Sequence, residues 1–476
     1  MSQTPIIDTL KEYSKRKRTS FSMPGHKGGN GLNKTFKRNI ADYDVTELDD
    51  TLNLHNPNNP IKEAKRLAAE FFGAGDTYFL VGGSTSGIFS MLAATASYGD
   101  TVIVNRASHQ AVINACIILG LKPVYIPQNV IDGFSVPAGI NQTDLIKIID
   151  DNPDVKAVLI TSPSYYGTCS DIETISKITR ARGIPLLVDE AHGAHFAVNQ
   201  NLFPNTALSQ GADLVVQSAH KTLNAMNQAA YLHVSGDIVN RKRLEKVLAM
   251  YQTSSPSYPI IATADMARAE LDSKSGRNAW RVVYENCERF RNNISSKTDV
   301  EFISTMLNGK YNINSVDETR IVMNFSAYKI TGFEIAKRLR ENYNIDVEMA
   351  DLFNVVAIAT PANTAKDFIK LTNAILKICR ELEKSEEEPV FPAVPIPDMG
   401  MTPQEAFYAK SKKVRLEEAV GAISATTVLA YPPAVPIVCV GEYLTEDSIA
   451  YIQALQEIGA EIIGLDGTMY ISVVEK

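Results

Sequence analysis

Residues 212–233, ADLVVQSAHKTLNAMNQAAYLH, join a short apolar run to a cluster of small polar residues that contains Lys221. The apolar and β-branched residues at 212–217 predict a buried strand that ends at this cluster. Burial in apolar surroundings lowers the pKa of an amine, and the neutral amine is the nucleophilic form. Lys221 is therefore either a nucleophile at the mouth of a sheet or an exposed lysine that follows a strand.

A second buried strand is predicted upstream, at 183–191 (GIPLLVDEA), and it carries Asp189 near its end. The interval between Asp189 and Lys221 leaves room for a helix and for a crossover to a parallel neighbouring strand. A site for pyridoxal 5'-phosphate (PLP) needs these two groups: a lysine that bonds the aldehyde, and an acid that keeps the pyridine nitrogen protonated. The pair therefore predicts PLP chemistry.

Strand and helix patterns alternate from residue 101 to residue 182, which predicts βαβ units and a mostly parallel sheet with its site at the carboxyl ends of the strands. Four motifs then point to a family: MPGHKGG at 23–29, SPSYYG at 162–167, VDEAHGAH at 188–195 and SAHKTL at 218–223. Together they resemble the PLP-dependent ornithine/lysine/arginine decarboxylases over nearly the whole chain. The resemblance implies an α/β chain of the aspartate aminotransferase-like PLP-dependent transferase fold. In that fold helices flank the sheet, and smaller α+β domains follow towards the C-terminus.

A stretch rich in glycine and hydroxyl groups, LVGGSTSG at 80–87, precedes a helical apolar pattern. Backbone N–H groups and the hydroxyls of Ser84, Thr85 and Ser86 converge there on a helix N-terminus. This arrangement suits a phosphate dianion, but it is also a common way to cap a helix. The nearby lysine and aspartate favour the phosphate interpretation, and the resemblance places Ser84 and Thr85 on the phosphate.

The resemblance assigns further cofactor contacts. It implies that His109, in NRASHQAV (105–112), stacks on the cofactor ring and leaves the other face to Lys221, although a lone histidine after a strand is also typical of a loop. It also implies that Ser254, in QTSSPSYP (252–259), crosses the dimer interface to the phosphate of a neighbouring subunit. A plain surface loop is the alternative there.

Other side chains are expected beside these. Ser218 and His220 are expected on the phosphate, and His192 is expected to border the pocket. A zinc site built from Asp189, His192 and His195 is not predicted, because no fourth ligand occurs at a suitable spacing.

The change of pattern along the chain predicts several units. They are an N-terminal segment (1–60), a large PLP-binding domain (61–298), a small α+β domain (299–383), a charged, proline-rich linker (384–400) and a C-terminal domain (401–476). The last unit resembles the terminal domain peculiar to the decarboxylases, with Tyr431, Pro432 and Pro433 in its motif. Larger family members carry an extra receiver-like domain before MPGHK. We therefore expect a homodimer with shared active sites, or a doubled form of it, in place of a large ring.

The composition limits partners and location. The net charge is −7, which argues against nucleic acid or an anionic membrane as a partner. The five cysteines are scattered and form no C-x-x-C pair, which suggests a reducing compartment. No apolar stretch resembles a signal peptide or a membrane span, so a cytoplasmic location is expected.

The predicted activity is PLP-dependent α-decarboxylation of a small-molecule basic amino acid, in polyamine synthesis. Arginine, which gives agmatine, is favoured because the resemblance links this activity to the shorter members; lysine to cadaverine and ornithine to putrescine stay open. Glu348, Asp351 and Glu442 are candidates for pairing with the distal cation of the substrate, and an exposed carboxylate is the alternative for each. An aminotransferase or another PLP lyase is the alternative activity. A catalytically idle binding homologue is the alternative class, against which the set of Lys221, Asp189 and His109 argues.

Overall fold

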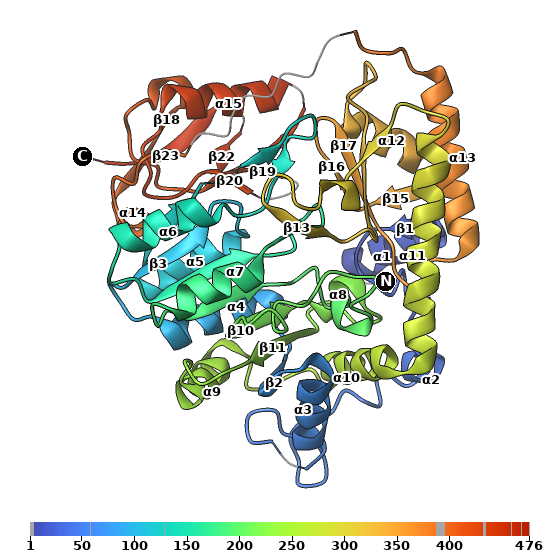
Figure 1. Cartoon of the computed structure of the whole chain (residues 1–476), viewed down its shortest axis with the longest axis horizontal. Helices are drawn as coiled ribbons and strands as arrows, with labels where there is room; N and C mark the ends of the chain where they lie inside the picture. Colours follow the sequence, from blue (N-terminus) through green and yellow to red (C-terminus); the bar gives the residue numbers. More distant parts are fainter. Residues whose placement is uncertain are drawn as a thin grey trace.

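The computed structural model describes residues 4–57, 59–127, 129–386, 396–431, 435–457, 459–467 and 469–475. A central seven-stranded sheet with helices on both faces dominates the larger part of the chain (Figure 1). Its strands, in spatial order, are β2 (Asp76–Leu80), β11 (Ala230–Val234), β10 (Leu214–Gln217), β9 (Leu186–Asp189), β7 (Ala157–Thr161), β3 (Thr101–Asn105) and β4 (Lys122–Ile126). Neighbours run parallel except at β11, which is antiparallel to both β10 and β2. The predicted mostly parallel sheet is confirmed.

Two apolar cores cover the two faces of this sheet, because side chains alternate between faces along a strand. In β3, Val102 and Val104 point into one core and Ile103 points into the other. The first core contains α4 (Gly83–Thr95), α5 (Gln110–Leu119) and α9 (Arg241–Tyr251). The second contains α3 (Asn59–Phe72), α6 (Gln142–Asp151), α7 (Ile172–Arg180), α10 (Tyr258–Asp272) and α11 (Lys274–Ser295). Strands buried on both faces read as continuous apolar runs, which is why they are visible in the sequence.

The parallel strands bring their carboxyl ends to one edge of the sheet. Asp189 is the last residue of β9 and pairs in register with Thr161 of β7 and Val216 of β10. Directly after β10, the one-turn helix α8 (Ala219–Thr222) carries Lys221. An acid and an amine from adjacent strands therefore meet at the same edge.

Helix α4 approaches β10 closely at Gly87. A Cβ atom added to Gly87 would lie 2.4 Å from Cγ2 of Val216 and 2.9 Å from Cδ1 of Leu80. Only glycine leaves room for this approach. The contact sets the N-terminus of α4 beside the end of β10.

A smaller antiparallel sheet has the order β12 (Glu301–Phe302), β14 (Arg320–Asn324), β17 (Asn354–Ile358) and β16 (Met349–Ala350). Helices α12 (Gly332–Asn342) and α13 (Ala365–Glu381) accompany it (Figure 1). The N-terminal strand β1 (Thr19–Phe21), which follows α1 (Pro5–Lys15), pairs in parallel with β15 (Ile345–Val347). Short elements complete this part and its contact with the large sheet: α2 (Lys34–Arg38), β5 (Val130–Ile131) with β6 (Val136–Pro137), and β8 (Thr168–Ser170) with β13 (Ile313–Val316).

The C-terminal part is also α+β, as predicted. One sheet contains β18 (Ser411–Arg415), β23 (Tyr470–Val474) and β22 (Leu465–Asp466), and another contains β20 (Val435–Val438), β19 (Val428–Tyr431) and β21 (Glu461–Ile463). Helices α14 (Pro403–Tyr408) and α15 (Glu446–Glu457) belong to the same part. Ile113 and Ile117 of α5 pack against Ala406, Cys439 and Val440, which docks the C-terminal part on the large sheet.

The predicted domain limits stay a prediction. Residues 387–395 of the expected linker, together with Pro432 and Pro433, lie outside the described residues. Within the described ranges, no helix combines the length and apolar character needed to cross a membrane.

Candidate active site

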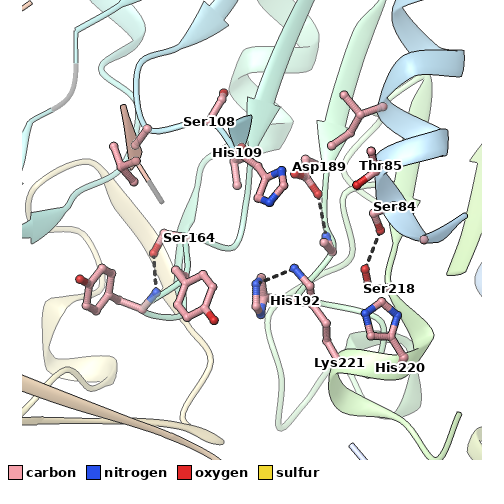
Figure 2. A pocket seen from close by; sticks show the side chains of 18 of the residues that line it. Ser84, Thr85, Ser108, His109, Ser164, Asp189, His192, Ser218, His220 and Lys221 are labelled. Atoms are coloured by element: carbon pink, nitrogen blue, oxygen red, sulfur yellow. Dashed lines mark hydrogen bonds between the residues drawn. The ribbon is translucent and has the colours of Figure 1, made fainter. Parts of the chain in front are cut away.

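A cavity of about 380 Å³ lies at the carboxyl edge of the central sheet (Figure 2). The segments that follow β2, β3, β7, β9 and β10 form its walls, and Val435 of the C-terminal part also lines it. The predicted site residues that line this cavity are Ser84, Thr85, His109, Asp189, His192, Ser218, His220 and Lys221. The fold thus gathers at one place residues that are far apart in the sequence.

Lys221 is half-buried in the wall of this cavity, and its Nζ lies 2.9 Å from Nε2 of His192. Burial lowers the pKa of Lys221, and the nearby carboxylate of Asp189 opposes this effect. Burial also holds the pKa of His192 well below its usual value, and the cations of Lys221 and Arg320 add to the effect. His192 is therefore a neutral imidazole beside an amine that holds its proton weakly.

Asp189 and His109 face Lys221 from the other side of the cavity (Figure 2). Asp189 is buried at the end of β9, where its Oδ1 accepts the backbone N–H of Ala191 at 3.1 Å. His109 is the N-cap of α5, where its Nδ1 accepts the backbone N–H of Ala111 at 3.1 Å. Because of this capping bond the imidazole ring is held in one orientation, and burial lowers its pKa.

Hydroxyl and backbone N–H groups gather at another end of the cavity. The Oγ atoms of Ser84 and Ser218 lie 2.7 Å apart, and Thr85 lines the same wall. The first turn of α4 leaves backbone N–H groups without intrahelical acceptors, and the positive end of the helix dipole favours an anion. His220 bonds the carbonyl of Ala229 through Nδ1 at 3.0 Å, and burial lowers its pKa to about 4. The neutral His220 ring donates its one N–H to that carbonyl, so the donors left for a phosphate at this end are the hydroxyls and the backbone N–H groups.

Two predicted phosphate ligands lie away from the cavity lining. Ser86 uses its Oγ inside α4, where it donates to the carbonyl oxygen of Gly83 at 2.9 Å. Ser254 is exposed in the loop between α9 and α10. A cofactor contact by Ser254 therefore requires a second subunit and stays a prediction.

Sequence comparison assigns the chain to a family. The model of the Orn/Lys/Arg decarboxylase major domain matches residues 4–317, and that of the C-terminal domain matches residues 386–469. An arginine decarboxylase of Bacillus subtilis (strain 168) is 31% identical over 484 residues, which cover 100% of this chain and 98% of that protein. The chain belongs to the Orn/Lys/Arg decarboxylase family.

More distant relatives agree with this assignment. The inducible lysine decarboxylase of Escherichia coli (strain K12) is 24% identical over 567 residues, which cover 97% of this chain and 78% of that protein. The structure of the E. coli constitutive lysine decarboxylase superposes with a TM-score of 0.78 at 18% identity, covering 99% of this chain and 82% of that chain. An alanine–glyoxylate aminotransferase from Nostoc sp. superposes with a TM-score of 0.57 at 13% identity, covering 76% of this chain and 95% of that chain. The predicted PLP-dependent transferase fold is confirmed.

Family membership makes this chain a PLP-dependent amino acid decarboxylase, so the predicted enzyme class and cofactor are confirmed. The cavity of this Orn/Lys/Arg decarboxylase suits the cofactor. Lys221 offers an amine that would bond the aldehyde, and Asp189 offers a buried carboxylate for the pyridine nitrogen. The N-terminus of α4, with Ser84 and Ser218, offers donors for the phosphate.

Glu348, Asp351 and Glu442 were the candidates for pairing with the distal cation of the substrate. None of the three is exposed, so the alternative of an exposed carboxylate is wrong for each of them. Glu442 is buried in an ion pair with Arg106 and also accepts the backbone N–H of Cys439 at 2.7 Å. Its carboxylate is satisfied inside the fold, so the geometry contradicts a role in substrate binding. The ion pair joins the C-terminal part to the segment that follows β3.

Asp351 is similarly occupied. Its Oδ1 accepts the backbone N–H groups of Phe353 and Asn354 at 3.0 and 2.8 Å, and its Oδ2 accepts the hydroxyl of Tyr166 at 2.8 Å. These bonds hold the turn before β17. Glu348 has more acceptor capacity left, because one oxygen accepts the backbone N–H of Met23 at 2.7 Å and the other accepts the Tyr165 hydroxyl.

The sequence patterns did not identify two buried basic residues near this site, Arg320 and Lys27. Arg320, at the start of β14, donates from Nη2 to Nδ1 of His192 at 2.7 Å. Lys27 donates to the carbonyl of Ser22 at 2.6 Å, and burial lowers its pKa to about 7, with Glu348 opposing. Both residues stand in polar stretches that read as turns or strand ends. Their burial depends on partners far away in the sequence.

His195 lies in an aromatic cluster beside a buried carboxylate. It stacks on Trp280 with ring centroids 4.6 Å apart, and its Nε2 lies 3.2 Å from Oδ2 of Asp317. Across the described residues, no group of three or more metal-ligating side chains was found.

Proposed function

We propose that this decarboxylase removes the α-carboxylate of arginine and forms agmatine, with Lys221 as the residue that bonds the cofactor. One observation carries the proposal: Lys221, Asp189 and the N-terminus of α4 line the same cavity. When bound, PLP supplies a ring that takes up the electron pair left at Cα as CO2 departs.

The side chains of the chain divide the remaining work. Asp189 holds the proton on the pyridine nitrogen, because a buried carboxylate stabilises the adjacent cation. His109 supports one face of the ring, while Lys221 approaches from the other. Ser84, Thr85 and Ser218 hold the phosphate, with Ser254 of a second subunit as an added donor, while His220 lines the cavity with its N–H donated to Ala229. These roles are proposals for each residue.

Arginine is favoured by the relatives. The arginine decarboxylase of B. subtilis matches this chain over almost the full length of both proteins at 31% identity, whereas the E. coli lysine decarboxylase shares 24%. Lysine to cadaverine and ornithine to putrescine are the other outcomes. A role in polyamine synthesis follows from any of the three products.

The test is to incubate purified protein and PLP separately with arginine, lysine and ornithine, and to measure both CO2 release and the amine formed. We expect agmatine as the main product, and no amine from Lys221→Ala. An amine from lysine or ornithine in excess of agmatine would correct the substrate. A keto acid formed without CO2 would instead identify an aminotransferase, the alternative activity.

The homodimer with shared active sites and the cytoplasmic location stay proposals. The shared site has a direct check: Ser254→Ala should weaken the binding of PLP. Mixing Ser254→Ala chains with Lys221→Ala chains should give heterodimers in which one site keeps both residues. Unchanged PLP affinity in Ser254→Ala would remove this residue from the site.

A further inference from the structure

Three side chains form a hydrogen-bonded row that ends at the reactive amine. Arg320 of β14 donates from Nη2 to Nδ1 of His192 at 2.7 Å, and Nε2 of His192 lies 2.9 Å from Nζ of Lys221. The row joins the small sheet to the cavity wall. His192 stands between a permanent cation and the amine.

Counting protons along the row determines which atom donates at each bond. Arginine stays protonated in proteins and has only donors, so Nδ1 of His192 must be the acceptor. A neutral imidazole carries one proton, which is then on Nε2. This Nε2–H needs an acceptor at Lys221. An ammonium group has three donors and no lone pair, so only the neutral amine completes the row.

We propose that Arg320 acts through His192 as a positioning residue that keeps Lys221 a neutral amine, with its lone pair directed at Nε2–H, until the cofactor aldehyde is bonded. A neutral amine has the lone pair that attack on a carbonyl carbon requires. The inference goes beyond the proposed function, because it concerns the lysine before substrate binds. It holds for any of the three substrates.

The charges around the row act in both directions. Asp189 of β9 and Glu348, between β15 and β16, favour the ammonium form of Lys221, whereas burial and the Arg320 cation oppose it. His192 also faces His109, His220 and the ring of Tyr165, whose centroid lies 4.7 Å from that of His192. The carboxylates alone would keep Lys221 charged. Burial is the largest effect that opposes them, and the row adds to it.

The surroundings of Arg320 argue against a purely structural role. Arg320 is 1% exposed, and its Nε and Nη1 atoms have no hydrogen-bond partner within the described part of the chain. A buried arginine that serves stability is normally paired with a carboxylate, because an unpaired buried charge is costly. Here the hydrogen bond of the guanidinium goes to an imidazole. The carboxylates of Asp317 and Glu348 stabilise this cation only through space, and a buried guanidinium held in this way is typical of functional sites.

The experiment uses the full chain freed of cofactor and measures the pH dependence of Lys221 acylation by peptide mass spectrometry. The exposed Lys177 in the same sample serves as the internal reference. We expect Arg320→Met to raise the pH midpoint of Lys221 by at least about 1 unit, which slows acylation about tenfold below the midpoint. Arg320→Lys, which keeps a cationic donor, should return the midpoint most of the way to that of the native chain.

Substitutions of His192 separate hydrogen bonding from charge. His192→Gln should keep a low midpoint, since its amide oxygen can accept from Arg320 while its NH2 group donates to Lys221. His192→Glu can only accept, and it should raise the midpoint. Arg268→Met is the matched control, because Arg268 is also buried but pairs with Asp265 at 2.7 Å, away from the row. It should leave the midpoint unchanged.

A spectroscopic measurement on the native chain tests the proposal even where an Arg320 variant fails to fold. The chain has 7 histidines, so ¹⁵N-histidine labelling, with His192→Gln to assign the signal, reports the tautomer of His192 in the native sequence. A proton on Nε2 alone supports the proposal. A proton on Nδ1 or on both nitrogens, or equal midpoints in Arg320→Met and the native chain, would overturn it while leaving the decarboxylase activity in place.

Discussion

Replacing Glu442 by Gln should destabilise the chain by about 3–5 kcal/mol, because it leaves the Arg106 cation buried without its counter-charge. Arg106 and Glu442 have side chains that are 1% and 0% exposed, and Arg106 Nη2 lies 3.0 Å from Glu442 Oε2. The guanidinium also donates to the carbonyl of Ile437 at 2.8 Å and lies 4.8 Å from the centre of the Tyr125 ring.

The assay is urea unfolding followed by circular dichroism for the native chain and for the single and double variants. Arg106→Met combined with Glu442→Leu should recover much of the loss, because apolar side chains fill the site without an unpaired charge. The matched control is Lys413→Ala, which removes the exposed pair of Lys413 with Asp466 and should change stability by less than about 1 kcal/mol. A loss below about 1 kcal/mol in Glu442→Gln would refute the reasoning that this buried pair stabilises the chain.

Further predictions concern the site and the fold. Lys221→Ala should abolish turnover and the visible absorbance of bound PLP, and activity retained in that variant contradicts the proposed function. Asp189→Asn should lower kcat by about 10²–10³ with the phosphate site intact, as measured by steady-state kinetics and PLP titration. Gly87→Val should cost at least about 1–3 kcal/mol through overlap with Val216, seen in the urea midpoint, whereas Ser97→Ala at an exposed position should not. Burial lowers the pKa of Lys27 to about 7 in the folded chain, below its value in the unfolded chain. Between about pH 7 and pH 10 the unfolded state therefore binds more protons, so the free energy of unfolding should rise with pH over this range. Lys27→Met should flatten this rise.

The sequence was informative wherever a local pattern carried the physical cause. The strand at 212–217 and the strand ending at Asp189 are buried on both faces, so their apolar runs are continuous and visible. The glycine-rich start of α4 was visible for a similar reason, because a tight helix start needs small residues near a strand end. Lys221, Asp189 and Ser84 could therefore be proposed for one site.

Local patterns failed where a side chain depends on a distant partner. Glu442 resembled a free carboxylate until the fold placed Arg106 against it, and Asp351 resembled one until Tyr166 and the turn before β17 occupied both of its oxygens. Ser86 stands in the same stretch as Ser84, but helix geometry turns its hydroxyl back to Gly83.

The sequence by itself determined the parallel sheet, the amine and acid at its edge, and the family, because apolar periodicity and short motifs are properties of neighbouring residues. Tertiary structure alone decided which charges are satisfied and which remain available. Arg320 reaches His192 from another sheet, and Arg106 meets Glu442 across more than three hundred residues. Electrostatic interactions depend on distance and burial in three dimensions, and sequence spacing contains neither.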